Sequence, residues 1–166
     1  MRIGIDIDDT LTNTSESFAN VVKKYNINFT KKFKDRWTKE EFESFVPYLD
    51  EILGCAEFKE DTIKVIQKLN ELGHELYIIT ARGNNYSKNI ETITNNMLEN
   101  NNLTFKEIYY NQYKKSDIAK KLNIDLMIDD NKSVYFNMQN ESIDCILFGD
   151  KIKTWKEVFE YINRKG

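Results

Sequence analysis

The sequence predicts an α/β protein in which a doubly wound parallel sheet carries a small helical cap after its first strand. Short apolar runs alternate with helical patterns through the second half of the chain, which is typical of such sheets. Residues 15–58, after the first apolar run, contain no convincing strand. A length of 166 residues suits one sheet domain with a short insertion. We therefore expect a core domain, 1–14 with 59–166, and a cap at 15–58.

Five short apolar runs rich in Ile, Leu, Tyr and Phe are the predicted strands. They cover Ile3–Ile7, Leu76–Ile79, Ile108–Tyr110, Leu126–Ile128 and Cys145–Phe148. Runs of this length and composition are typical of strands that are buried on both faces of a parallel sheet.

The core helices are predicted between these strands, at residues 61–72, 87–98, 116–122 and 132–138. In the first of them, Val65, Leu69 and Leu72 have the spacing of one buried helix face. Gly73 follows where a helix C-cap is expected. Thr154 and Glu157 form a capping box that opens a final helix.

The cap contains two predicted helix starts. Asn13 and Glu16 fit the start of a helix that runs through Val22. Thr38 and Glu41 form a second capping box. No other segment of the cap has a comparable signal.

The counts of histidine and cysteine exclude several chemistries. One histidine, His74, cannot build a multi-histidine metal site, and two distant cysteines, Cys55 and Cys145, cannot make a zinc finger or a disulfide framework. A Ser-His-Asp triad would have to use His74, which we expect to be structural. Catalysis must therefore depend mainly on carboxylates, lysine, threonine and a hard metal ion.

The charge pattern and the absence of long apolar segments predict a cytoplasmic protein. The formal net charge is −3, which gives no general attraction to nucleic acid or to anionic membranes. No apolar run approaches the roughly 20 residues that span a bilayer, and acidic residues follow the first strand at once, which is unlike a signal peptide. Lys31, Lys32 and Lys34 are expected to be solvated. The oligomeric state stays open.

Two carboxylates follow the first predicted strand. Asp6 and Asp8 are two residues apart, so their side chains point to the same side if the strand continues through them. Ligands of open α/β sheets bind at the carboxyl ends of the strands. The alternative is a simple turn that Asp8 or Asp9 caps. The apolar strand in front of the pair favours the site.

Two further segments supply polar groups for an anion. Thr80, Ala81 and Arg82 follow the second strand, where a hydroxyl and backbone amides can meet a phosphate. Arg82 fits an anion-binding role and a surface ion pair equally well. Lys114 and Lys115 both stand at a helix start, and Lys115 is preferred because Ser116 is a natural N-cap beside it.

The fourth predicted strand ends in Asp129 and Asp130. Asp129 comes first after the apolar run and is expected to join Asp6 and Asp8, while Asp130 supports the site or caps the next helix. An all-oxygen set from Asp6, Asp8 and Asp129 suits Mg²⁺ better than zinc.

Together these residues resemble the haloacid dehalogenase (HAD) superfamily of aspartate-nucleophile phosphotransferases. Its four motifs occur in order as Asp6-x-Asp8-x-Thr10, Thr80, a Lys at 114 or 115, and Asp129-Asp130. The short cap, the Ile-Thr-Ala-Arg segment ending at Arg82 and the Leu-Met-Ile-Asp-Asp-Asn segment from Leu126 are most similar to bacterial relatives of the 5′(3′)-deoxyribonucleotidases. The chain departs from many members at Asp9, where they have Gly.

The resemblance implies a Rossmannoid fold and a role for each residue. Asp6 would be the nucleophile, and Asp8 would protonate the leaving oxygen and then activate water. Mg²⁺ would be held by the Asp6 side chain, the Asp8 backbone carbonyl and Asp129, with Asp130 as a supporting acid. Phosphate or substrate would contact Asp9, Thr10, Thr80, Ala81, Arg82, Lys115 and Phe18.

The substrate implied is a (deoxy)nucleoside monophosphate, and the main alternative is a sugar phosphate or another small phosphomonoester. Phe18, closest in sequence to the catalytic turn, is the first candidate among the cap aromatics Phe18, Trp37, Phe42, Phe45 and Tyr48; alternatively these rings hold the cap together. A receiver domain would place its acceptor aspartate before the threonine, whereas here Asp129 follows both Thr80 and Lys115. A catalytically silent binding protein on the same fold is the other rival.

Overall fold

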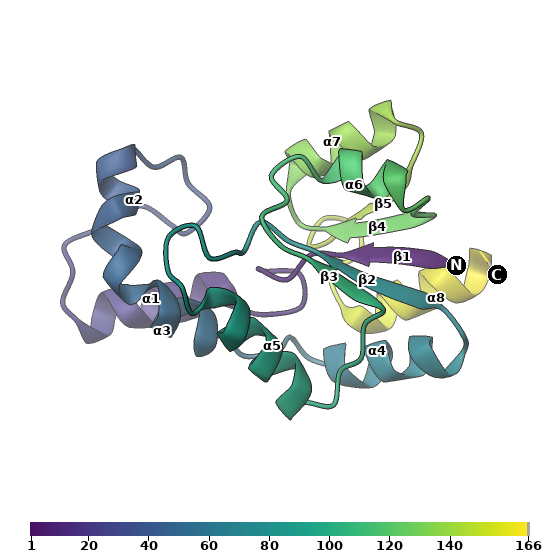
Figure 1. The fold of residues 1–166 in the computed structure, drawn as a ribbon, viewed down its shortest axis with the longest axis horizontal. Coiled ribbons are helices and arrows are strands. Elements are labelled where there is room, and N and C mark those ends of the chain that lie inside the picture. The colour runs from purple at the N-terminus through teal and green to yellow at the C-terminus, as the bar shows by residue number, and fades with distance from the viewer. Residues whose placement is uncertain (166) are drawn as a thin grey trace.

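The computed structural model describes residues 1–165 and contains a single five-stranded parallel sheet (Figure 1). The strand order is β3-β2-β1-β4-β5, so the first strand is central. The strands are β1 (Arg2–Ile5), β2 (Glu75–Ile79), β3 (Glu107–Tyr109), β4 (Leu126–Asp129) and β5 (Asp144–Leu147). The predicted fold class is therefore confirmed.

Helices cover both faces of this sheet. Those of the core are α4 (Thr62–Glu71), α5 (Ile90–Asn100), α6 (Lys115–Lys121), α7 (Lys132–Asn140) and α8 (Trp155–Lys165). Residues of α4, α5 and α8 pack on one face, and residues of α6 and α7 pack on the other. Successive side chains of a strand point to opposite faces of the sheet. Ile3 and Ile5 of β1, two residues apart, therefore both lie on the face that α4 covers.

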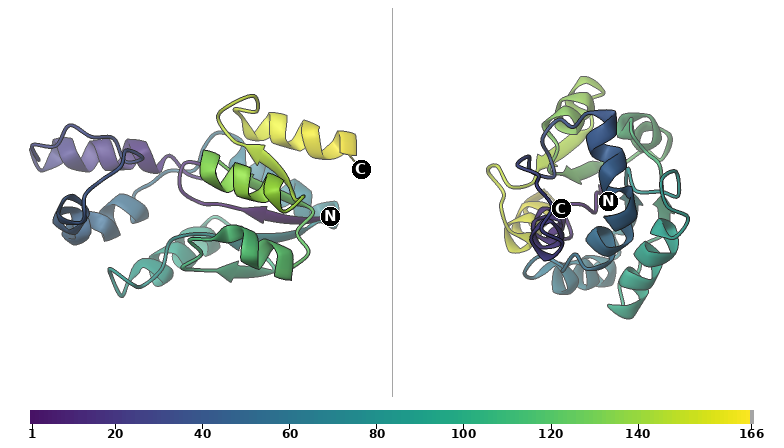
Figure 2. Two further views of the ribbon diagram at one scale, coloured as in Figure 1. Left: turned by 90° about the horizontal axis from the view of Figure 1, so that it is seen from above. Right: turned by 90° about the vertical axis from the view of Figure 1, so that its left-hand side faces the viewer.

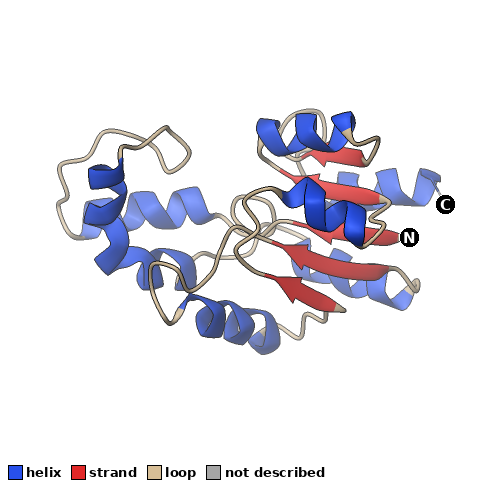
Figure 3. Cartoon of the chain, turned by 45° about the horizontal axis from the view of Figure 1, so that its top comes forward, coloured by secondary structure: helices blue, strands red, loops and turns tan. Residues whose placement is uncertain are grey.

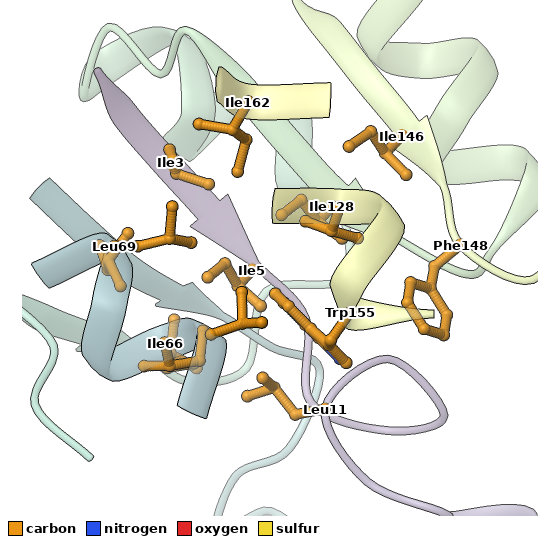
Figure 4. Packing of buried hydrophobic residues seen from close by; sticks show 14 of the residues in the cluster. Ile3, Ile5, Leu11, Ile66, Leu69, Ile128, Ile146, Phe148, Trp155 and Ile162 are labelled. Carbon is orange, nitrogen blue, oxygen red and sulfur yellow. The ribbon is translucent and has the colours of Figure 1, made fainter. Parts of the chain in front are cut away.

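The larger hydrophobic cluster contains Trp155 at the start of α8 (Figure 4). Its indole is fully buried among residues such as Ile5, Leu11 and Phe148. The indole Nε1 donates a hydrogen bond to the backbone oxygen of Thr10 at 2.9 Å. The last helix therefore holds the loop that follows β1.

The cap segment forms a separate helical layer beyond the carboxyl ends of the strands (Figure 3). It contains α1 (Thr14–Lys24), α2 (Lys39–Phe45), the 3₁₀ helix η1 (Val46–Tyr48) and α3 (Leu49–Gly54). β1 begins and α8 ends at the opposite end of the molecule (Figure 2). The strands therefore point their carboxyl ends at the cap.

Most predicted helix boundaries are confirmed within a few residues. Thr38 and Glu41 form both hydrogen bonds of a capping box, at 3.2 and 2.7 Å. Thr154 and Glu157 do the same, at 3.2 and 2.9 Å. Gly73 has a φ of +81° just after α4, which is the left-handed conformation expected after a helix end.

Three local expectations were wrong. The first strand ends at Ile5 rather than Ile7, because the chain turns sharply after Asp6. Asn13 stands at the N-cap of α1, but its side chain accepts a hydrogen bond from Lys59 instead of capping the helix. Ser116 is not an N-cap: α6 begins at Lys115, one residue earlier.

The two cysteines lie in different surroundings, from which we expect different reactivities. Cys55 is exposed, whereas Cys145 on β5 is buried and its burial raises the pKa of the thiol to about 12. Because the thiolate is the reactive form, we expect iodoacetamide at pH 8 to label Cys55 in the native protein and both residues in urea. Mass spectrometry of the labelled chain measures this. A Cys55→Ser variant should show no native labelling, and rapid native labelling of Cys145 would contradict the burial argument.

Within residues 1–165, no helix is both long and apolar enough to cross a membrane.

Candidate active site

The carboxyl ends of two neighbouring strands bring two buried carboxylates together. Asp6 directly follows β1, and Asp129 is the last residue of β4. The Asp6 amide donates to the Ile128 backbone oxygen at 3.0 Å, which continues the pairing of the two strands beyond Ile5. Asp6 is 6% exposed and Asp129 is fully buried. Such a pair needs a cation nearby.

Lys115, the first residue of α6, supplies one positive charge between the two carboxylates. Its Nζ donates to Asp6 Oδ1 at 2.6 Å and to Asp129 Oδ2 at 2.7 Å, and its side chain is buried. Lys114 instead pairs with Asp117 on the surface, at 3.0 Å. Lys115, and not Lys114, is thus the lysine that lies at the two carboxylates, although Ser116 is not the N-cap that suggested it.

The site carries more negative charge than Lys115 balances. The pKa of Asp6 is raised to about 7, mainly by burial and also by the nearby Asp129 and Asp8, against the opposing effect of Lys115. Burial by itself would lower the pKa of Lys115, but the two carboxylates outweigh burial and hold it above its ordinary value. Both shifts indicate that a second cation would be stabilised here.

Three carboxylates have the spacing of a cation site. Oxygen atoms of Asp6, Asp129 and Asp130 lie within 4.8 Å of one another. Asp129 is oriented by the Asn131 amide, which donates to its Oδ1 at 2.8 Å. A donor set made only of oxygen fits a hard ion such as Mg²⁺. The group contains the carboxylate of Asp130 and not that of Asp8. For Asp8, the resemblance implied that the backbone carbonyl would bind the ion.

Asp130 has polar neighbours from the turn after β1 and from the cap. Thr10 Oγ1 donates to Asp130 Oδ1 at 3.3 Å, and Lys34 forms an ion pair with the same carboxylate. The next helix, α7, is capped by Asn131 and not by Asp130, because Asn131 Oδ1 accepts from the Ser133 amide at 2.8 Å. Asp130 therefore lines the cavity beside Asp6 and Asp129 and does not cap α7.

The turn after β1 is held tightly by main-chain hydrogen bonds. The amides of Thr10, Leu11 and Thr12 all donate to the Ile7 oxygen, at 2.9 to 3.2 Å. Asp9 has a φ of +57°, a left-handed conformation that explains why glycine suits this position. Its short carboxylate accepts from the Ser15 amide at 2.8 Å, at the start of α1. Asp9 therefore connects the turn to the cap.

The residues after β2 adopt a different arrangement from the one predicted. Thr80 is fully buried, and its Oγ1 accepts from the Arg82 amide at 3.1 Å. Ala81 lines the cavity beside Asp6. Arg82 forms neither a surface ion pair nor an open anion site: its buried guanidinium binds Asp8, with Nη2 at 2.7 Å from Oδ1. Burial would raise the pKa of Asp8, but Arg82 and the Thr14 hydroxyl hold it below its ordinary value.

A cavity of about 680 Å³ opens over the acidic residues. The cap contributes Phe33 and Lys34 to its wall. The core contributes Asp6, Asp8, Ala81, Gln112, Tyr113, Lys115, Asp129, Asp130, Asn131, Lys132 and Val134. No sequence pattern marks Phe33, Gln112 or Tyr113 as residues of this wall. Lys34 is exposed, as expected, and also lies 3.4 Å from Asp9.

Phe18 lies elsewhere, in the aromatic core of the cap. It is 3% exposed and contacts the rings of Phe29, Phe33, Trp37 and Phe45. Of these rings, only Phe33 lines the acidic cavity. Phe18 thus lies where it stabilises the cap. This agrees with the alternative in which the aromatic rings hold the cap together.

No family model matches the sequence, and no curated protein matches it. Solved structures match its fold over nearly the whole chain. A HAD-superfamily hydrolase from Ehrlichia chaffeensis is 14% identical, with a TM-score of 0.56 and coverage of 98% of this chain and 96% of that one. The fold is that of HAD-superfamily hydrolases.

Two further structures agree with this fold. A HAD-superfamily hydrolase of subfamily IA, variant 1, from Geobacter sulfurreducens is 8% identical with a TM-score of 0.62, covering 97% of this chain and 95% of that chain. The HAD-hydrolase candidate YfnB from Bacillus subtilis, bound to magnesium, is 14% identical with a TM-score of 0.66, covering 98% of each chain. At such identities the likeness establishes the fold, and the site residues of this chain carry the argument for its chemistry.

Proposed function

We propose that this protein is a Mg²⁺-dependent phosphomonoester hydrolase that acts through an aspartyl-phosphate on Asp6. The observation that carries the proposal is the buried group of Asp6, Asp129 and Lys115, in a cavity that also exposes Asp8. A HAD fold with these residues at its strand ends supports the proposal. Residues 15–58 would be the cap that covers the substrate.

Asp6 is the proposed nucleophile. Lys115 binds its Oδ1, which leaves Oδ2 for in-line attack on phosphorus as the bond to the leaving alcohol breaks. Asp8 gives the alcohol oxygen a proton and later takes one from the water that hydrolyses the aspartyl-phosphate. Lys115, the Thr80 hydroxyl and the backbone amides near Asp8 and Asp9 would bind the remaining phosphoryl oxygens.

Asp6, Asp129 and Asp130 are the carboxylates that would hold Mg²⁺, together with the Asp8 backbone carbonyl. When bound, the ion neutralises charge on the phosphoryl group and aligns it for displacement.

Nucleoside monophosphates are the first proposed substrate class, from the resemblance to deoxyribonucleotidases. A sugar phosphate or another small phosphomonoester is the second. The similarity in fold to a phosphoglycolate phosphatase candidate from Lactobacillus delbrueckii, with a TM-score of 0.65 at 12% identity, supports it.

A phosphate-release screen tests the proposal. The panel contains deoxy- and ribonucleoside monophosphates, phosphoglycolate, sugar phosphates and 4-nitrophenyl phosphate, each with Mg²⁺ and with EDTA. We expect Mg²⁺-dependent release from at least one natural substrate and its loss with EDTA. Release from none of them would contradict the proposed function and would favour a silent binding protein.

A further inference from the structure

Arg82 is a buried cation whose three guanidinium nitrogens each hydrogen-bond to side chains of the protein. Its side chain is 1% exposed. Nη2 donates to Asp8 Oδ1 at 2.7 Å, and Nε lies 3.2 Å from Oδ1 and 3.1 Å from Oδ2 of the same carboxylate. Nη1 donates to the buried hydroxyl of Thr94 on α5, at 3.1 Å. The guanidinium is therefore fixed between α5 and the turn after β1.

Thr14 holds the same carboxylate from the side of the cap. Its Oγ1 donates to Asp8 Oδ1 at 2.6 Å and also lies 2.9 Å from Thr12 Oγ1. Oδ1 thus has Thr14 and Arg82 as donors, while Oδ2 has only the Nε contact at 3.1 Å. Because each carboxylate oxygen has about two lone-pair sites, Oδ1 is saturated and Oδ2 keeps capacity for a proton.

We propose that Arg82 is a positioning residue that, with Thr14, orients Asp8 so that Oδ2 transfers the proton to and from the reacting groups. This inference rests on the proposed function, which makes Asp8 the acid and base. In the first step the bond from phosphorus to the alcohol oxygen breaks, Asp6 Oδ2 bonds to phosphorus, and a proton that Asp8 Oδ2 has taken up from water moves to the alcohol. In the second step water gives a proton to Asp8 Oδ2, its oxygen bonds to phosphorus, and Asp6 is released.

This geometry separates Arg82 from a phosphate-binding role. To reach a phosphate, the guanidinium would have to leave Asp8, whose carboxylate would then keep only Thr14 as a donor. A positioning residue and a phosphate ligand also differ in what they affect. The first affects proton delivery to the leaving oxygen, whereas the second affects binding of every phosphorylated substrate equally.

The test compares Arg82→Lys with the wild-type protein on two substrates that share the phosphoryl group. One is the best alkyl phosphate of the screen, whose alcohol leaves slowly without a proton. The other is 4-nitrophenyl phosphate, whose nitrophenolate leaves without one. Lysine keeps the charge but lacks the planar fork that binds both oxygens. We expect kcat/KM to fall at least about tenfold on the alkyl phosphate and less than about threefold on the aryl phosphate. The inhibition constant for inorganic phosphate should not change.

Each alternative result overturns the inference in a recognisable way. An equal loss on both substrates would assign Arg82 a purely structural role. A weaker inhibition by inorganic phosphate, in proportion to the lost kcat/KM, would make Arg82 a phosphate ligand. A wild-type protein that hydrolyses neither substrate would overturn the proposed function itself, and the inference with it.

A second variant covers the case in which Arg82→Lys does not fold. Thr94→Val removes the other partner of the guanidinium without touching Asp8, and Thr104→Val is the matched control at an exposed position. We expect Thr94→Val to slow hydrolysis of the alkyl phosphate selectively and Thr104→Val to leave both rates unchanged. Equal rates of Thr94→Val and wild type on the alkyl phosphate would overturn the positioning role.

Discussion

Replacing Asp6 by Asn is expected to lower the rate of phosphate release by at least about 10³-fold while the protein stays folded. The amide has nearly the shape of the carboxylate but cannot attack phosphorus. Its introduction removes one of two buried carboxylates that share a single lysine, so Lys115 and Asp129 remain as a neutral pair. The free energy of unfolding should accordingly be unchanged or higher. Steady-state kinetics and urea unfolding measure the two effects.

Asp117→Asn is the matched control for this substitution. Asp117 is an exposed carboxylate on α6 that pairs with Lys114, so the same chemical change there should affect neither turnover nor stability. Near-normal turnover of Asp6→Asn would show that Asp6 is not the nucleophile. A loss of turnover accompanied by unfolding would leave only a structural role for the carboxylate.

Replacing Lys115 by Met is expected to lower the free energy of unfolding in the absence of metal by about 3–5 kcal/mol, because it leaves buried carboxylates without their charge partner. The two hydrogen bonds at 2.6 and 2.7 Å are lost at the same time. Urea unfolding in EDTA measures the effect. Lys114→Met, one residue away and exposed, should change stability by less than about 0.5 kcal/mol. Equal stability of the two variants would contradict the buried ion pair.

The penalty of Lys115→Met should also depend on pH. The pKa of Asp6 is already raised to about 7, mainly by burial, and the loss of Lys115 removes the charge that opposes this shift. A carboxyl group with a raised pKa in the folded state binds its proton more tightly there than in the unfolded state. Its protonated form therefore stabilises the fold at low pH, and this contribution is lost as pH rises through the folded-state pKa. We expect a smaller penalty at pH 5 than at pH 8, and a constant penalty would contradict the assignment.

The sheet was predictable because both of its faces are covered. Leu126, Met127 and Ile128 of β4 are all buried, so the strand is a continuous apolar run in the sequence. Such a run is typical of a strand that is covered on both faces of a parallel sheet. Carboxylates placed directly after such runs must meet at one edge, so Asp6 and Asp129 followed from topology alone. The strand ends were less predictable, because the turn after Asp6 depends on amides that converge on the Ile7 oxygen.

Contacts between distant segments were not predictable in the same way. Arg82 meets Asp8 across 74 positions, and its direction depends on Thr94 of a helix whose packing the sequence does not specify. The position of Phe18 was also not predictable from the sequence. Its closeness in sequence to the catalytic turn suggested substrate contact, but burial of apolar surface against four other rings determines where it packs.

The hydrogen bond from Trp155 to the Thr10 backbone oxygen has a consequence for the order of synthesis. It joins residues separated by 145 positions and holds the turn that carries Asp8. Translation delivers Asp6 and Asp8 to the ribosome exit tunnel first, yet the turn is complete only after α8 has emerged and docked. A nascent chain stalled before Trp155 therefore carries the acidic residues without the support of their turn, and the proposed hydrolysis should begin only after α8 has docked.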